Sequence, residues 1–89
     1  MDEKGRKIMA VLTVNVIDYN TNRPVPGAIV TINGTAVVTN NRGQASFDAT
    51  PSTYNLSVSC ANYTSTAQLL TLTNNQTITI RIVPRLGWL

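Results

Sequence analysis

Strict alternation of apolar and polar residues constrains this 89-residue chain more than any other feature. The clearest example is residues 54–60, where apolar or aromatic side chains fill every second position and Asn or Ser fills the positions between. The same period recurs in residues 9–18, 28–33, 45–49 and 77–82. Two further stretches are expected to be strands: residues 36–39, which are short, and residues 64–73, whose pattern is more ambiguous. A period of two places successive side chains on opposite faces of an extended strand, whereas a helix repeats every 3.6 residues. The pattern therefore predicts seven strands and no amphipathic helix.

Turn-forming residues separate these stretches. Asn33-Gly34 is a strong hairpin signal, because both residues tolerate positive φ, and Asn-, Gly- or Pro-containing segments divide the other stretches. Seven short strands with turns every 8–12 residues predict an all-β fold, a seven-stranded antiparallel β-sandwich of the Ig-like or transthyretin-like kind. Pro26-Gly27 is predicted to form a tight entry to an edge strand. Adjacent Leu69 and Leu70 leave open which of the two points into the core.

The length allows one domain. We expect residues 1–7 to form a flexible charged N-terminal segment, residues 8–83 the β-sandwich, and residues 84–89 an apolar C-terminal tail.

The residue inventory excludes several kinds of site. The chain has no His and one Cys, which rules out His/Cys zinc sites, Cys-His pairs and Ser-His-Asp triads. After residue 7 the only carboxylates are Asp18, at the end of the first predicted strand, and Asp48, on a predicted outward face, so we do not expect them to share a catalytic cleft. Asp18 with Asn20 and Asn22 has the spacing of a weak calcium site, but an Asx-turn explains the same residues more simply. We therefore predict a protein that is not an enzyme, with no catalytic residue, no metal and no cofactor.

Charge and composition bear on the partners and the location. The formal charge is +3, and the four arginines after residue 7 are scattered rather than clustered with aromatics, so no nucleic-acid partner is expected. The apolar stretch of residues 8–12 is too short for a membrane span or a secretion signal. Thirteen Thr and ten Asn are typical of extracellular or particle-surface β-proteins. A complete product without an export signal would fit a virus or phage particle, and a fragment would fit an appended domain of a secreted or cell-surface protein.

Several motifs occur in the order found in a known family. They are Val14-Asn15-Val16 leading to Asp18, Pro24-Val25-Pro26-Gly27-Ala28, Thr39-x3-Gly43-x3-Phe47, Tyr54-x-Leu56-x-Val58 and Asn62-Tyr63. Over residues 11–83 the chain resembles carboxypeptidase regulatory-like domains, which have a transthyretin-like (prealbumin-like) sandwich and are similar to collagen-adhesin B-type repeats. The resemblance implies a non-catalytic appendage of an exported protein or a surface domain of a viral particle. Ser52 and Asn62 depart from the family pattern, because Gly is common at both positions.

Two sets of residues are candidates for contacts with partners. Leu86, Trp88 and Leu89 are apolar residues beyond the last strand, and we expect them to make assembly contacts, with local packing as an equal alternative. Tyr19 and Tyr63 lie in predicted loops, where aromatic rings can stack on a glycan. For Tyr63, packing over the end of the sandwich is the more frequent role of such a residue. The leading hypothesis is a structural or surface-display module that self-assembles or joins a larger particle or extracellular assembly. The alternative is a carbohydrate-binding or adhesion module.

Overall fold

The computed structural model describes residues 9–85, which form seven strands. Their bounds are β1 Ala10–Asp18, β2 Ile29–Ile32, β3 Thr35–Val38, β4 Gln44–Ala49, β5 Ser52–Ser59, β6 Thr66–Leu72 and β7 Gln76–Ile82. Each predicted strand is confirmed, with its ends within two residues of those expected. Residues 9–85 contain no helix, and so none that is long and apolar enough to cross a membrane.

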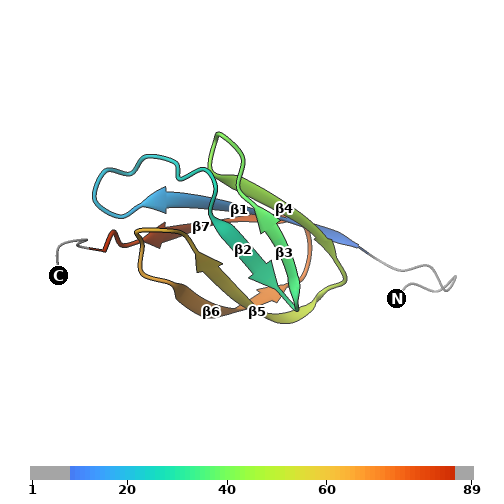
Figure 1. The fold of residues 1–89 in the computed structure, drawn as a ribbon. Helices are drawn as coiled ribbons and strands as arrows, with labels where there is room; N and C mark the ends of the chain where they lie inside the picture. Colours follow the sequence, from blue (N-terminus) through green and yellow to red (C-terminus); the bar gives the residue numbers. More distant parts are fainter. Residues whose placement is uncertain (1–8, 86–89) are drawn as a thin grey trace, which may run out of the picture.

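The strands form two sheets, with the orders β4-β1-β7 and β3-β2-β5-β6, which face each other as a sandwich (Figure 1). The prediction of a seven-stranded sandwich is confirmed. The prediction that all pairing is antiparallel is wrong at one place, because β1 and β7 run parallel, with Leu12 opposite Gln76 and Asp18 opposite Ile82. Alternation specifies which face a residue occupies but not the direction of a strand. All four strands of the β3-β2-β5-β6 sheet lie between β1 and β7 in the chain, and β7 then pairs with β1 in the same direction.

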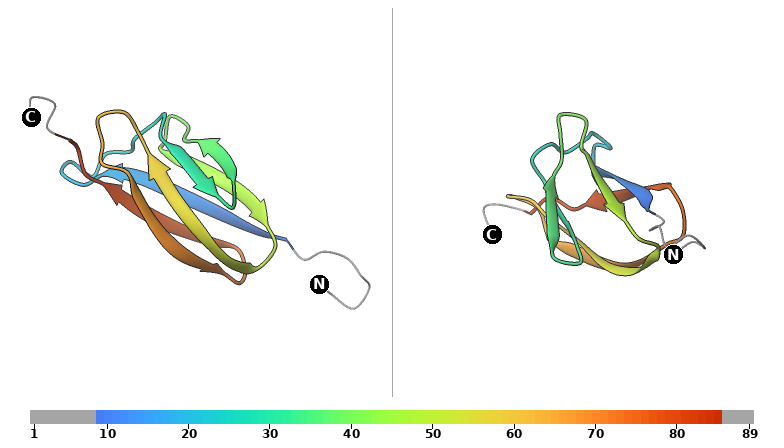
Figure 2. Two further views of the ribbon diagram at one scale, coloured as in Figure 1. Left: turned by 60° about the horizontal axis from the view of Figure 1, so that its bottom comes forward. Right: turned by 90° about the vertical axis from the view of Figure 1, so that its right-hand side faces the viewer.

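The parallel pair determines where the chain enters and leaves the sandwich. β1 begins at Ala10 at one end, and β7 finishes at the other end, where Ile82 lies opposite Asp18. Figures 1 and 2 show that β1 begins at one end of the molecule and that β7 finishes at the other. A nine-residue strand such as β1 spans about 26 Å.

The core lies between the sheets and consists of inward residues of the alternating stretches together with Val25 from the loop before β2. The buried apolar residues are Ala10, Leu12, Val14, Val16, Val25, Ala28, Val30, Ile32, Ala45, Phe47, Leu56, Val58, Leu70, Leu72, Ile80 and Ile82. The structure decides the Leu69–Leu70 ambiguity, because Leu70 is 8% exposed and Leu69 is 70% exposed. Tyr54 and Cys60 are partly buried and pack against this core.

Thr39 is the only buried polar residue among residues 9–85, and it holds the loop before β2 in place. Its hydroxyl donates to the Val25 carbonyl at 2.7 Å and accepts from the Ala28 N–H at 2.9 Å. Its backbone carbonyl accepts from the N–H of Gly27. The Pro26-Gly27 turn does not lead into an edge strand as predicted, since β2 lies between β3 and β5.

Gly43 has a positive φ of 73° in the turn between β3 and β4, and its carbonyl accepts from the N–H of Val16 at 2.8 Å. This glycine lies directly against the backbone of Val16 and of Val25. The Thr39-x3-Gly43 motif therefore has a structural explanation. Thr39 satisfies backbone groups of the buried residues Val25 and Ala28 in the loop before β2, and Gly43 allows a close approach of three chain segments.

Candidate functional site

One end of the sandwich, which we call the loop end, contains the loop after β1, residues 60–65 and the residues after β7. Asp18 is the centre of its hydrogen bonding. Its Oδ1 accepts from the N–H of Asn20 at 2.8 Å and of Thr21 at 3.0 Å, and its Oδ2 accepts from the Tyr63 hydroxyl at 2.7 Å. The predicted Asx-turn is confirmed. Asp18 thereby joins the first loop of the chain to a residue 45 positions away.

Two of the three residues considered as calcium ligands, Asp18 and Asn22, use their side-chain oxygens in hydrogen bonds within the protein. Both carboxylate oxygens of Asp18 accept hydrogen bonds, and the side-chain oxygen of Asn22 accepts from the Arg81 guanidinium. Within residues 9–85 there is no group of three or more His, Cys, Asp or Glu that could hold a metal ion.

The Asp18–Tyr63 bond shifts the pKa of both groups in opposite directions. The Tyr63 hydroxyl stabilises the charged carboxylate and lowers the pKa of Asp18 below its ordinary value, with further help from the N–H groups of Thr21 and Asn20. The same hydrogen bond raises the pKa of Tyr63, because losing the proton would place two negative charges side by side. The pair is therefore most stable with Asp18 charged and Tyr63 neutral.

The two candidate ligand-contact tyrosines lie at this same end but in different surroundings. The side chain of Tyr19 is 59% exposed, and its backbone N–H donates to the Ile82 carbonyl at 2.9 Å. Tyr63 is partly buried, packs against the core and donates its hydroxyl to Asp18. Only the Tyr19 ring is therefore open for stacking.

The three candidate assembly residues, Leu86, Trp88 and Leu89, lie outside the described residues. The segment that leads to them is held at the loop end. Tyr63 pairs with Pro84 in a β-bridge, and the Arg85 N–H donates to the Asn62 carbonyl at 2.8 Å. The chain therefore leaves the sandwich beside the loops that carry the tyrosines.

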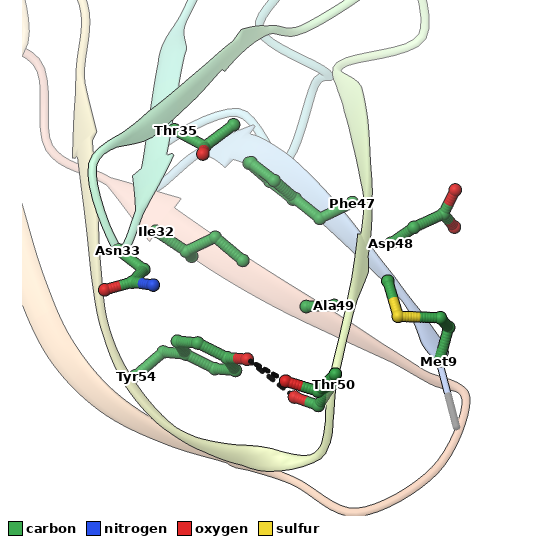
Figure 3. Close-up of a pocket in the computed structure, with 9 residues that line it drawn as sticks. All are labelled: Met9, Ile32, Asn33, Thr35, Phe47, Asp48, Ala49, Thr50 and Tyr54. Carbon is green, nitrogen blue, oxygen red and sulfur yellow. Dashed lines mark hydrogen bonds between the residues drawn. The ribbon is translucent and has the colours of Figure 1, made fainter. Parts of the chain in front are cut away.

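A pocket of about 300 Å³ lies at the opposite end, where β1 begins and β4 ends (Figure 3). Its lining residues are Met9, Ile32, Asn33, Thr35, Phe47, Asp48, Ala49, Thr50 and Tyr54. The Tyr54 hydroxyl donates to the Thr50 carbonyl at 2.6 Å, and the Asp48 carboxylate points away from Tyr54 (Figure 3). The volume is at the small end for ligand sites. The lining mixes apolar residues with Asn, Thr and Tyr, and Asp48 is its one carboxylate, so the lining contains no pair of carboxylates for acid–base catalysis. Sequence reasoning missed this pocket, because its residues come from segments up to 45 positions apart.

The two carboxylates of the described domain are far apart. Asp48 lies opposite Val11 near the start of β1, whereas Asp18 is the last residue of that strand. Seven residues of extended chain separate the two positions by about 23 Å, well beyond the roughly 5–10 Å between the carboxyl groups of a glycosidase. The prediction that they share no cleft is confirmed.

Comparison with solved structures gives the same fold at low sequence identity. One match is the Bacillus anthracis TIE protein, with a TM-score of 0.68 and 18% identity, covering 86% of this chain and 17% of that one. A second is the group B streptococcus pilus 2b backbone protein, with a TM-score of 0.66 and 13% identity, covering 85% and 41%. A third is a type II cohesin–X–dockerin complex from Acetivibrio cellulolyticus, with a TM-score of 0.64 and 20% identity, covering 85% and 55%. The chain thus spans between about a sixth and about half of the chains it matches.

Comparison with curated proteins gave no match. The family model described as "Carboxypeptidase regulatory-like domain" matches residues 11–85, which is most of the chain and includes all seven strands except the first residue of β1. The motifs that suggested this resemblance also occupy defined structural positions: Thr39 and Gly43 lie between β3 and β4 and contact the loop before β2, and Tyr63 lies against Asp18. The chain belongs to the carboxypeptidase regulatory-like domain family.

Proposed function

We propose that this protein is a non-catalytic structural module that spaces or displays its neighbours at the surface of a virus or phage particle or of another extracellular assembly. The observation that carries the proposal is the parallel pairing of β1 with β7, which places chain entry and exit at opposite ends. A module of this kind adds at least the length of β1, about 26 Å, to any chain or assembly that continues through it. A sandwich with both termini at one end would project sideways instead.

The family and the fold support this proposal. Domains of the same fold occur in a pilus backbone protein and in a cohesin–X–dockerin complex, both at 20% identity or less. In this chain the two carboxylates of the described domain are too far apart to act as a glycosidase pair. Its rigidity comes from a continuous apolar core between the two sheets.

The assembly contacts are proposed to come from Leu86, Trp88 and Leu89, which follow directly on the segment held at the loop end. Light scattering on the full chain tests this. We expect the parent protein to form species much larger than a dimer. A variant with all three residues changed to Ser should form nothing larger than a dimer and should keep the unfolding midpoint of the parent. Tyr19→Ser is the matched control, because it removes an exposed aromatic ring from the same end and should leave assembly intact. An unchanged mass in the triple variant, or no large species in the parent, would contradict the assembly role.

Glycan binding is the second candidate function, and the exposed Tyr19 ring beside the Asp18–Tyr63 pair favours it. A glycan-binding screen followed by Tyr19→Ala tests it. Saturable binding that Tyr19→Ala abolishes in a folded protein would support an adhesion module. Tyr63→Phe, which keeps the ring and removes the hydroxyl, should leave such binding largely unchanged. Absence of saturable binding would reject this candidate.

A further inference from the structure

The sandwich has four edge strands: β4 and β7 in one sheet, and β3 and β6 in the other. An edge strand presents unpaired N–H and C=O groups, which are a template for pairing with a strand of another chain. Native proteins usually protect such edges with charged residues, with Pro, by keeping the strand short or by covering it. The four edges of this sandwich differ in how far they are protected.

Three edges carry a recognisable protection. β3 has only four residues, β4 contains the exposed Asp48, and β7 contains the exposed Arg81. β6 has seven residues, Thr66–Leu72, without a charged residue or a Pro. Among residues 9–85, no strand other than β5 pairs with β6, and no turn or loop residue forms a backbone hydrogen bond with it. Figure 1 shows β6 at the margin of the larger sheet.

The side chains of β6 give a second, independent observation. Leu69, at the centre of the strand, is 70% exposed, the largest value among the exposed large hydrophobic residues of the described chain. It lies on the outer face, as do Ala67 and Thr71, whose positions alternate with those of the buried Leu70 and Leu72. No charge accompanies this apolar centre on β6 or on the adjoining β5.

We propose that β6 pairs antiparallel with β6 of a second copy of this chain, around a two-fold axis at Leu69. The two four-stranded sheets would then form one continuous sheet of eight strands. An isologous contact of this kind uses the same surface on both subunits. A second copy is the occupant because the strand is self-complementary: it opposes no like charges and places the exposed Leu69 against its own copy.

The pairing has a definite register. With Leu69 opposite Leu69, Ala67 lies opposite Thr71 of the other copy, and all seven residues of each strand are paired. Any shift leaves residues unpaired at the strand ends. A shift of the register by an even number of residues also moves the two Leu69 side chains apart. A shift by an odd number places outward residues of one copy opposite inward residues of the other, so the outer faces of the two sheets would no longer match. The contact needs no terminal residue, so it is separate from the tail contacts proposed above.

Cysteine cross-linking in the full chain tests this register. The native Cys60 is first replaced by Ala, with thermal unfolding as the check on folding. Ala67→Cys and Thr71→Cys are then made in separate chains, one of them carrying a mass tag. Directly opposed Cβ atoms are about 4.5–5.5 Å apart, a separation that a small backbone adjustment reduces to disulfide range. Two copies of position 67 are four residues apart along the strand direction, or about 13 Å.

We expect the mixture to form the mixed disulfide at least about tenfold faster than either variant alone, and Leu69→Cys to cross-link with itself. Thr79→Cys on β7, an exposed position on the other seven-residue edge, is the control and should remain uncross-linked. Equal cross-linking in the single variants, or in Thr79→Cys, would overturn the register. No cross-linking in any β6 variant would overturn the pairing itself.

Leu69→Lys supplies a second measurement, because it places two like charges on the two-fold axis. We expect it to weaken dimerisation at least about tenfold by sedimentation equilibrium in the tail variant with Ser at residues 86, 88 and 89. Thr79→Lys should have no such effect. A dimer that survives Leu69→Lys, or a parent that shows no β6 cross-link and no dimer, would refute the proposal. The tail variant should keep its β6 cross-links, so the failure of either proposal is distinguishable from the failure of the other.

Discussion

Replacing Gly43 by Ala should destabilise this domain more than any other single methyl addition at a glycine of the described chain. A Cβ atom at this position would lie 2.7 Å from the Val16 carbonyl oxygen and 2.9 Å from the Val25 nitrogen, both of them backbone atoms that cannot rotate away. The left-handed conformation costs an alanine about 1–2 kcal/mol. Overpacking adds about 1–3 kcal/mol, while the reduced entropy of the unfolded chain offsets about 0.4–1 kcal/mol. We therefore expect a net loss of about 3 kcal/mol.

Gly34→Ala is the matched control, because Gly34 has nearly the same positive φ but nothing within 4 Å of an added Cβ. It should lose only the conformational part, about 1 kcal/mol. At about 4–8 °C per kcal/mol for a domain of this size, thermal unfolding followed by circular dichroism should show a midpoint about 5 °C lower for Gly34→Ala. The same relation gives a decrease of about 12–24 °C for Gly43→Ala. Equal decreases would refute the reasoning, because they would mean that the close backbone approach at Gly43 has no energetic cost.

Three further predictions concern the loops and their hydrogen bonds. Thr39→Val keeps the shape of the side chain but leaves the Ala28 N–H and the Val25 carbonyl without their partner. Urea unfolding should therefore show a loss of about 2–4 kcal/mol in the free energy of unfolding. The control Thr77→Val, at an exposed position, should lose less than about 0.5 kcal/mol. Asp18 has a lowered pKa in the folded state, so its contribution to stability is present above about pH 4 and is lost as the pH falls through the folded pKa. The stability difference between the parent and Tyr63→Phe should therefore be largest near pH 6 and shrink near pH 2, and a constant difference would contradict it. Asn62 has a φ of 72°, so Asn62→Gly should retain the unfolding midpoint, while Asn62→Ala should lose about 1 kcal/mol of stability.

Much of the loop end could be anticipated from local sequence, but its long-range contacts could not. Asp18 followed by Asn20 predicts an Asx-turn, because that hydrogen bond closes within a few residues. The bond from Tyr63 to Asp18 spans 45 residues and depends on how two loops meet after the sheets have packed. The sequence favours a packing role for Tyr63, and the structure agrees, but Asp18 as the partner of Tyr63 and the exposure of the Tyr19 ring appear only in the structure.

Sequence alone determined the seven strands and the inward faces of β1, β2, β4, β5 and β7, because a period of two is a local property that each of these strands shows independently. It also indicated the family, through motifs such as Thr39-x3-Gly43 that now have a structural explanation. Only the tertiary structure decided that β1 and β7 run parallel, that Leu70 rather than Leu69 enters the core, and that β6, a strand without a charged residue or a Pro, lies at a sheet edge. The direction and order of strands depend on pairing between segments far apart in the chain. Alternation within one strand carries no information about its neighbour, so these features appear only once the sheets have formed.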